Sequence, residues 1–343
     1  MRSGGARRLR QTLKGETPII MRPISSILVP VANYSARSLP VVNKAAQLAT
    51  ALSAKLELFH DLANPITIEA LERPGNTLKS LKANTRRPAI EGLERLATPL
   101  RARGLTVTTA AAWDYPPYEA ILRRAVAIGA DLIVAPRRAR HRLPALLGYT
   151  DWELLRLSPI PVLLVKTATP YRRPTVLAAI DPTHAHAKPS ALDQRILDYG
   201  AQVGRVLRGA LHVVHAYKPQ PLPPAVTFDT KRREGLRADA EREARQTFDD
   251  ALLKRTIPAF RRHLVRGDPI AAIPATARKT RSAIVVIGAV SRSALKRLFI
   301  GNTAESVMDE LRCDLLVVKP AKFALRGPRS RRGPQFVSTA PHL

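Results

Sequence analysis

Five residues in the second half of the chain have types and spacing suited to holding an anion. A short apolar run leads into Gly288, a loop containing Ser291 follows, and Gly301 comes directly before Asn302 and Thr303. A glycine has no side chain, so its backbone can approach a ligand closely. A helix that begins after Gly301 would point its free N–H groups and the positive end of its dipole at a phosphate. We therefore interpret this segment as a candidate phosphate-binding loop.

Other interpretations of residues in this half stay open. Asn302 and Glu305 have the spacing of a capping box, so Asn302 is equally suited to capping its own helix. Asp181, His184 and His186 are close enough in sequence to ligate a metal ion together. A loop with two histidines is more often solvated, so we predict no metal site. No serine elbow or triad order is present, and we predict no catalytic residues.

Alternating β-rich runs and helical patterns must position these residues. This alternation is typical of βαβ units and of a doubly wound parallel sheet with helices on both faces. The first half has predicted strands at residues 26–31, 55–60, 105–110, 131–136 and 161–166. The second half has predicted strands at residues 175–180, 210–217, 262–265, 283–288 and 314–319. We therefore predict an α/β protein with two five-stranded sheets.

The two halves repeat the same order of elements. Thr150 and Asn302 begin equivalent helices, and so do Pro117 and Pro269. These pairs share an offset of about 150 residues, and a nearly constant offset indicates duplication. We expect a basic arm at residues 1–23, domains at residues 24–168 and 174–320, and a disordered basic tail at residues 321–343.

The composition limits the kinds of partner and location. The formal net charge of +29 favours electrostatic contact with phosphate polymers, although Arg is spread along the whole chain. The single Cys excludes an intramolecular disulfide and fits a reducing compartment such as the cytoplasm. No apolar run reaches the roughly 18 residues that a membrane-spanning helix needs, so we expect no membrane contact.

The loop from Gly288 to Thr303 resembles the phosphate-binding loop of the universal stress protein family. That family has glycine, two residues, glycine, nine residues, glycine, then Ser or Thr. Here Gly288 and Gly301 match, Ser291 replaces the middle glycine, and Asn302 precedes Thr303. In the family an Asp closes the first strand, and Asp181 matches it in the second domain. The runs around residues 150–166 and 301–320 resemble the tandem-domain E-type members.

The resemblance implies a fold, a ligand and a mode of assembly. The implied fold is a pair of adenine-nucleotide alpha-hydrolase-like domains related by a pseudo-two-fold axis. The implied role is a non-catalytic cytoplasmic stress-response module that binds ATP weakly. The implied nucleotide contacts are in domain 2 only: Asp181, Gly288, Ser291, Gly301, Asn302 and Thr303. The apolar runs at residues 162–165 and 315–318 are expected to join the domains as an internal pseudo-dimer, with further self-association to a homodimer.

The first domain departs from the family pattern. Ala32 stands where the family has Asp, and Pro136 ends the fourth strand where the family has Gly. We predict that this domain does not bind ATP in the family's manner. Two alternatives remain for the whole chain: a basic protein in non-specific contact with nucleic acid, and a nucleotide hydrolase.

Overall fold

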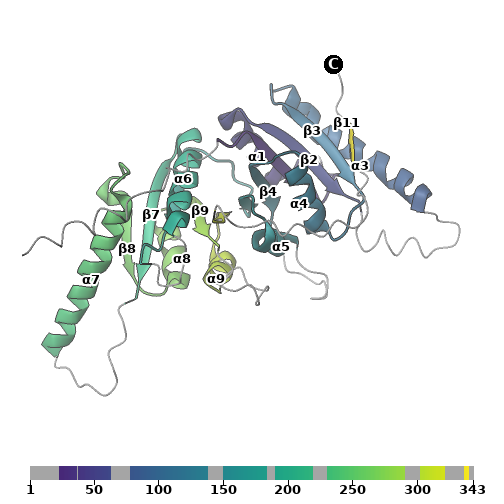
Figure 1. Cartoon of the computed structure of the whole chain (residues 1–343). Coiled ribbons are helices and arrows are strands. Elements are labelled where there is room, and N and C mark those ends of the chain that lie inside the picture. Colours follow the sequence, from purple (N-terminus) through teal and green to yellow (C-terminus); the bar gives the residue numbers. More distant parts are fainter. Residues whose placement is uncertain are drawn as a thin grey trace, which may run out of the picture.

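A computed structural model describes residues 23–36, 38–62, 78–137, 150–183, 190–218, 230–289, 302–320 and 336–339. Apart from residue 23, the predicted basic arm lies outside these residues, and so does the larger part of the predicted tail. Figure 1 shows the two halves of the chain side by side, the first in purple and blue and the second in green.

The first domain alternates strands and helices in the order that the sequence predicts. Its strands are β1 (Ser26–Pro30), β2 (Lys55–Asp61), β3 (Val107–Ala112), β4 (Leu132–Pro136) and β5 (Val162–Val165). Its helices are α1 (Pro40–Leu52), α3 (Leu78–Arg101), α4 (Pro117–Ala127) and α5 (Thr150–Leu157).

The second domain repeats this alternation. Its strands are β6 (Thr175–Ala179), β7 (Ala210–Tyr217), β8 (Arg262–Arg266), β9 (Ser282–Gly288) and β10 (Asp314–Val318). Its helices are α6 (Ser190–Val206), α7 (Thr230–Leu252), α8 (Pro269–Lys279) and α9 (Asn302–Glu310), with a short 3-10 turn η2 (Ala259–Arg261) before β8.

The two five-stranded parallel sheets join into one sheet of eleven strands, in the order β11-β3-β2-β1-β4-β5-β10-β9-β6-β7-β8. The join is an antiparallel pair between β5 and β10, in which Leu163 lies opposite Leu316. These are the two runs for which the sequence indicated a joining role within one chain. The α/β class with two doubly wound parallel sheets is confirmed.

Two layers of helices cover the joined sheet because successive strand residues point to opposite faces. Ile27 and Val29 pack into one core with α1, α3, α6 and α7, while Leu28 packs into a second core with α4, α5, α8 and α9. The strands are apolar on both sides for this reason, as parallel sheets require.

The C-terminal region differs from its expectation at four residues. Phe336–Thr339 forms β11, which pairs antiparallel with β3 at the edge of the sheet. The amide groups on the outer edge of β3 explain why an extended segment can add there, since an open sheet edge offers unpaired hydrogen-bonding groups.

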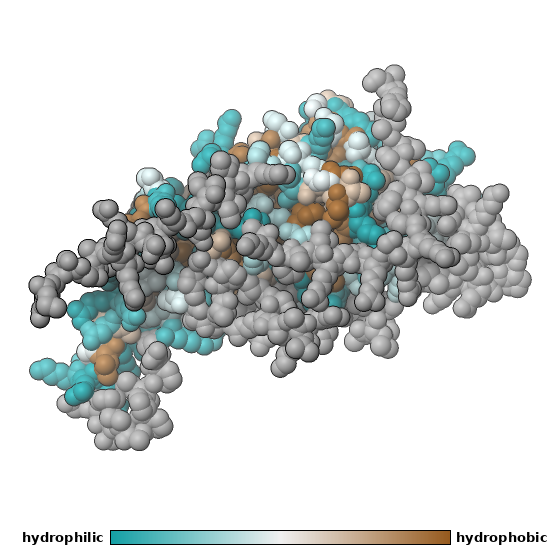
Figure 2. Space-filling view, in the orientation of Figure 1, coloured by the Kyte–Doolittle hydropathy of each residue, from teal (hydrophilic) through white to brown (hydrophobic). Residues whose placement is uncertain are grey.

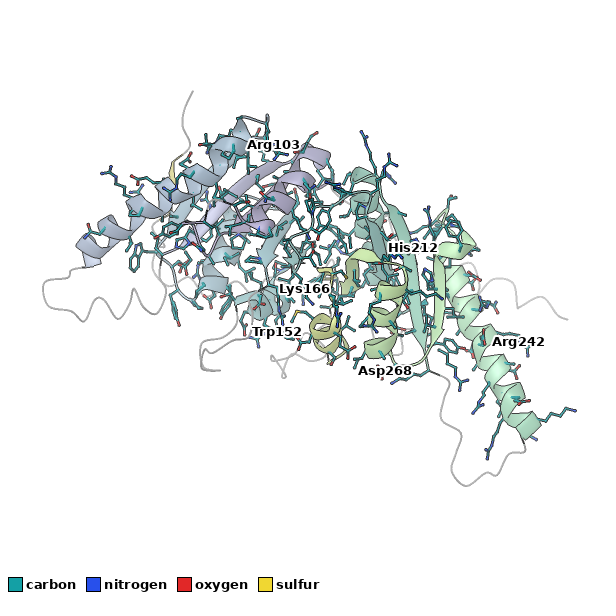
Figure 3. The ribbon with its side chains drawn as sticks, turned by 180° about the vertical axis from the view of Figure 1, so that it is seen from behind. Arg103, Trp152, Lys166, His212, Arg242 and Asp268 are labelled. Carbon is teal, nitrogen blue, oxygen red and sulfur yellow. The ribbon has the colours of Figure 1, made fainter. Side chains whose placement is uncertain are left out.

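Two lysines in equivalent places each reach the last helix of the other domain. Lys166 follows β5, and its Nζ donates hydrogen bonds to the carbonyl oxygens of Met308 and Leu311 at the end of α9. Lys319 follows β10, and its Nζ lies 3.3 Å from the carbonyl oxygen of Arg156 in α5. The last carbonyl oxygens of a helix have no partner within the helix, so these donors from the other domain help to hold the domains together. Figure 3 shows Lys166 between the two domains.

Candidate functional site

The strand order places the candidate site of the second domain at the carboxyl ends of β6 and β9. The chain runs outward from β6 to β7 and β8 and then crosses to β9 on the other side of β6. Ligands of doubly wound sheets bind at such a reversal of strand order. Asp181 follows β6, Gly288 ends β9, and the two strands are parallel neighbours. The sheet therefore brings these two predicted residues to the same edge.

Asp181 is held in place by neighbours on both sides. Its backbone N–H donates to Asp193 Oδ1 of α6 at 3.1 Å, and Thr183 Oγ1 donates to Asp181 Oδ1 at 2.8 Å. The second carboxylate oxygen, Oδ2, is buried and has no hydrogen-bond partner among the residues that the structure describes. A buried acceptor without a donor costs free energy, so a donor from a bound molecule would be favourable here.

Gly288 has a packing role that the sequence does not reveal. A Cβ atom added at this residue would lie 2.8 Å from Leu192 Cδ2 and 3.0 Å from Ile196 Cδ1, both on α6. The absence of a side chain therefore lets α6 pack closely against the end of β9. The sequence interpretation assigned this glycine to close approach of a ligand, and the helix supplies a second reason for it.

The remaining predicted residues are described only in part. Asn302 and Thr303 are the first two residues of α9, as the pattern predicts. Ser291 and Gly301 lie outside the described residues, and so do His184 and His186 of the weighed metal cluster. Within the described part of the chain, no three His, Cys, Asp or Glu side chains come together as a metal site would require.

The equivalent place in the first domain holds a cavity and a buried carboxylate. Asp151 is the second residue of α5, is 3% exposed, and accepts the backbone N–H of Trp152 at 3.1 Å. Arg137 Nε lies 3.7 Å from Asp151 Oδ2. A carboxylate of the protein itself thus accepts a backbone N–H in the first turn of α5, the end of a helix that attracts anions. Figure 3 shows Trp152 beside it on α5.

Two of these site residues were missed by the sequence reasoning. Asp193 is 3% exposed and contacts the backbone of Asp181, and its signal was an acidic residue in the first turn of a helix that follows the first strand. Asp151 was not singled out in the sequence, although it is an acidic residue directly after Thr150, the predicted start of a helix.

The projecting end of α7 carries charges of both signs. Figure 1 shows this end extending beyond the sheet, and Figure 2 shows it as largely hydrophilic. Arg242 pairs with Asp239, and Arg245 Nη2 lies 3.2 Å from Glu241 Oε1. A nucleic-acid interface usually shows clustered positive charge. This helix, most of whose described residues are exposed, therefore does not favour the nucleic-acid alternative.

The sequences of both halves of the chain match a model of a known protein family. A model of the universal stress protein family matches the chain twice, over residues 23–166 and 173–319. The chain belongs to the universal stress protein family. Each match covers one of the two structural domains, so the tandem arrangement of this universal stress protein chain is also shown.

Several known proteins are similar to this chain over more than half of its length. Universal stress protein E of Escherichia coli strain K12 is 31% identical over 231 residues, covering 64% of this chain and 70% of that protein. Universal stress protein E of Photorhabdus laumondii is 26% identical over 309 residues, covering 86% and 95%. A solved structure from Pseudomonas aeruginosa PAO1, described as functionally unknown, has 27% identity and a TM-score of 0.67, covering 88% of this chain and 94% of that chain.

The length and hydropathy of the helices are relevant to membrane insertion. Among the described residues, none of the helices combines the length and apolar character needed to cross a membrane.

Proposed function

We propose that this chain is a non-catalytic stress-response module of the cytoplasm whose second domain binds an adenine nucleotide weakly. The observation that carries the proposal is the Oδ2 of Asp181 at the reversal of strand order, which is buried and has no hydrogen-bond partner in the described part of the chain. A ribose hydroxyl or an amino group of a base would supply the donor that this oxygen lacks. The nucleoside would lie at the carboxyl ends of β6 and β9. The phosphates would bind at the start of α9, where backbone N–H groups attract anions.

The proposed contacts of the nucleotide follow from this placement. Asp181 would bind the nucleoside part, and the backbone of Asn302 and Thr303 would bind phosphate. Ser291 and Gly301 are proposed to border the phosphates because the family pattern places them in the connecting loop. Gly288 would contribute a backbone without a side chain at the floor of the site, where α6 already needs it.

The proposal is tested by equilibrium binding of labelled ATP to the full chain and to two variants. Asp181→Ala is expected to weaken ATP binding about tenfold or more, because a hydrogen bond to a charged group contributes about 1.5–3 kcal/mol. Asp239→Ala is the matched control, since it removes a carboxylate from the exposed face of α7. It should leave the affinity unchanged.

Two results would contradict the proposal. One is the absence of ATP binding by the full chain at millimolar concentration, and the other is equal affinity of wild type and Asp181→Ala. The non-catalytic assignment is checked separately by incubating the chain with ATP and Mg²⁺. Release of phosphate that scales with the amount of chain, and that Asp181→Ala abolishes, would support the hydrolase alternative instead.

A further inference from the structure

Arginines stand just before three neighbouring strands of the second domain. Arg281, Arg173 and Arg208 lie one or two residues before β9, β6 and β7, and β6 pairs in parallel with both of the other strands. The amino ends of parallel neighbours share one edge of a sheet, where the strands are about 4.8 Å apart. The backbone N–H of Ala210 donates to the carbonyl oxygen of Pro174 at 3.0 Å, so the turns before β7 and β6 are in direct contact. The three arginines therefore form a row along this edge.

The arginines of this row share an unfavourable backbone conformation. The φ angles of Arg173, Arg208 and Arg281 are 46°, 53° and 51°, in the left-handed region that favours glycine and disfavours residues with a Cβ. The first domain has Ser53 and Gly129 in the turns equivalent to those of Arg208 and Arg281, also with positive φ. The turns themselves therefore need no arginine. Residues kept in a strained conformation are a reason to look for a function of their side chains.

Further cations lie along the same edge, and the connections that form it carry no carboxylates. The connections before β6, β7, β8 and β9 contain neither Asp nor Glu. They are residues 166–174, 207–209, 253–261 and 280–281. Arg172 and Lys254 of these connections are exposed, as are all three arginines of the row. Within the part of the chain that the structure describes, none of these five cations forms an ion pair, so their charges are available to a partner.

Two large apolar side chains are exposed in the connection before β8. Leu253 is 77% exposed and Phe260 is 72% exposed. The guanidinium carbon of Arg261 lies 5.2 Å from the centroid of the Phe260 ring, so a cation stands over this ring. Exposed apolar side chains with polar residues around them mark surfaces that contact a partner. A partner of this edge therefore has both negative charge and apolar material.

This combination distinguishes between anionic partners. A small phosphate compound or the backbone of a nucleic acid would neutralise the arginines but would leave Leu253 in water. A membrane of anionic lipids has negative charge at its surface and acyl chains directly beneath it, so it accommodates cations and apolar side chains together. The edge also runs along the starts of neighbouring strands, which suits a flat surface.

From this arrangement we propose that the amino edge of the second domain's sheet docks on the surface of an anionic membrane. Leu253 and Phe260 enter the boundary between headgroups and acyl chains, and the arginine row contacts the headgroups. The sequence expectation of no membrane contact rested on the lack of an apolar run that could span a bilayer, and a surface contact needs no such run. The proposed nucleotide site lies at the carboxyl ends of the same strands, which is the opposite edge of the sheet.

Flotation of the full chain with two kinds of lipid vesicle tests the proposal. One kind is phosphatidylcholine alone, and the other is an equal mixture of phosphatidylcholine and the anionic phosphatidylglycerol. The chain is expected to bind the mixture at least tenfold more tightly at low salt, and added salt should release it because salt screens the charges. Equal binding to both kinds of vesicle, or no binding to the mixture at low salt, would overturn the proposal.

A triple glycine variant removes the charges of the row without straining the fold. It carries Arg173→Gly, Arg208→Gly and Arg281→Gly. Since glycine adopts positive φ readily, the midpoint of urea unfolding should not fall below that of wild type. Binding to the mixed vesicles should weaken at least tenfold, because each Lys or Arg near an anionic surface strengthens binding about fivefold.

A matched control separates this edge from the net charge of the chain. It carries Lys231→Ala, Arg233→Ala and Arg237→Ala. These exposed cations lie in the first turns of α7, which follow the carboxyl end of β7 and are therefore remote from the amino edge. The control loses as much charge as the glycine variant and should retain wild-type binding to the mixed vesicles. An equal loss in both variants would contradict docking through this edge.

The two apolar residues distinguish a membrane from a nucleic acid. Leu253→Ser with Phe260→Ser should weaken binding to the mixed vesicles at least tenfold, because less apolar surface leaves water on docking. Retention of the same variant on a DNA duplex should equal that of wild type. Unchanged vesicle binding in this variant would overturn the proposal. Tighter binding to the duplex than to the vesicles, lost in the glycine variant, would assign the edge to nucleic acid instead.

Discussion

Lys44 and Asp314 form a buried ion pair between the two domains, with Lys44 Nζ 2.5 Å from Asp314 Oδ2. The side chains are 2% and 0% exposed. Asp314 begins β10 in the second domain, and Lys44 lies on α1 in the first. Asp314 also accepts the hydroxyl of Tyr171 at 2.5 Å and the backbone N–H of Lys166 at 2.9 Å. One carboxylate therefore joins the first domain, the linker and the second domain.

Replacing this carboxylate should destabilise the whole chain. Asp314→Asn leaves Lys44 buried without a counter-charge, and removing one partner of a buried pair costs about 3–5 kcal/mol. Urea unfolding measures the loss. Glu91→Gln, in the exposed pair with Arg87 on α3, is the control and should leave the unfolding midpoint unchanged.

The double variant Lys44→Met with Asp314→Asn tests whether Lys44 and Asp314 stabilise the chain as an interacting pair or independently of each other. Because the uncompensated charge is gone, the double variant should be more stable than Asp314→Asn alone. Losses that simply add would show that Lys44 and Asp314 act independently.

Because Lys319 is buried, the free energy of unfolding of the chain should rise with pH. Burial lowers the pKa of Lys319 to about 7, whereas a lysine in the unfolded chain has a pKa of about 10.4. Between these values the unfolded state binds more protons, so raising the pH favours the folded state by up to about 1.4 kcal/mol per pH unit. The free energy of unfolding of wild type minus that of Lys319→Met should therefore increase from pH 7 to pH 9. Lys254→Met, at an exposed position, controls for the loss of a lysine. A pH-independent difference would refute the assignment.

A methyl group at Gly288 should destabilise the second domain through α6. Gly288→Ala places a Cβ 2.8 Å from Leu192 Cδ2, and overpacking of this kind costs about 1–3 kcal/mol. Gly235→Ala on α7 is the matched control because nothing lies within 4 Å of its added Cβ. Because Leu192→Ala removes the side chain that the new methyl group would meet, Gly288→Ala should cost less in a Leu192→Ala background than in wild type. Full stability of Gly288→Ala would contradict the packing role.

Two histidines at the outer edge of the second domain should resist protonation. His212 Nδ1 of β7 lies 2.9 Å from His263 Nε2 of β8, and Figure 3 places His212 on the sheet. Burial lowers the pKa of both imidazoles, and the charges of His263 and Arg261 lower the pKa of His212 further. Folding stability from this pair is present above about pH 6.5, the ordinary pKa, and is lost as the pH falls below it.

An NMR titration tests the pair directly. Both imidazoles should titrate below pH 6.5, and His263→Gln should raise the pKa of His212 because one positive neighbour is removed. Titration of His212 above pH 6.5 in wild type would show that burial and its basic neighbours do not govern it.

The candidate site could be predicted only where a local pattern marked it. The apolar run before Gly288 and the helix beginning at Asn302 were both found, because strand and helix signals lie within a few neighbouring residues. Asp181 followed from the resemblance to the family, in which an Asp closes the first strand. Asp193 was missed because its contact with Asp181 depends on how α6 packs against the sheet. The cavity in the first domain was missed for the same reason, since its walls come from five separate elements.

The sequence by itself determined the duplication, the order of strands and helices and the apolar character of both sheet faces. These are properties of residues close together in the chain, where hydrophobic period and turn chemistry act. Only the tertiary structure decided that Asp314 binds Lys44, that α6 fills the space beside Gly288, and that Asp151 is buried beside Arg137 at the start of α5. Each of these depends on side chains from different elements meeting after the chain has folded, and burial makes their charges and volumes matter far more than they do in water.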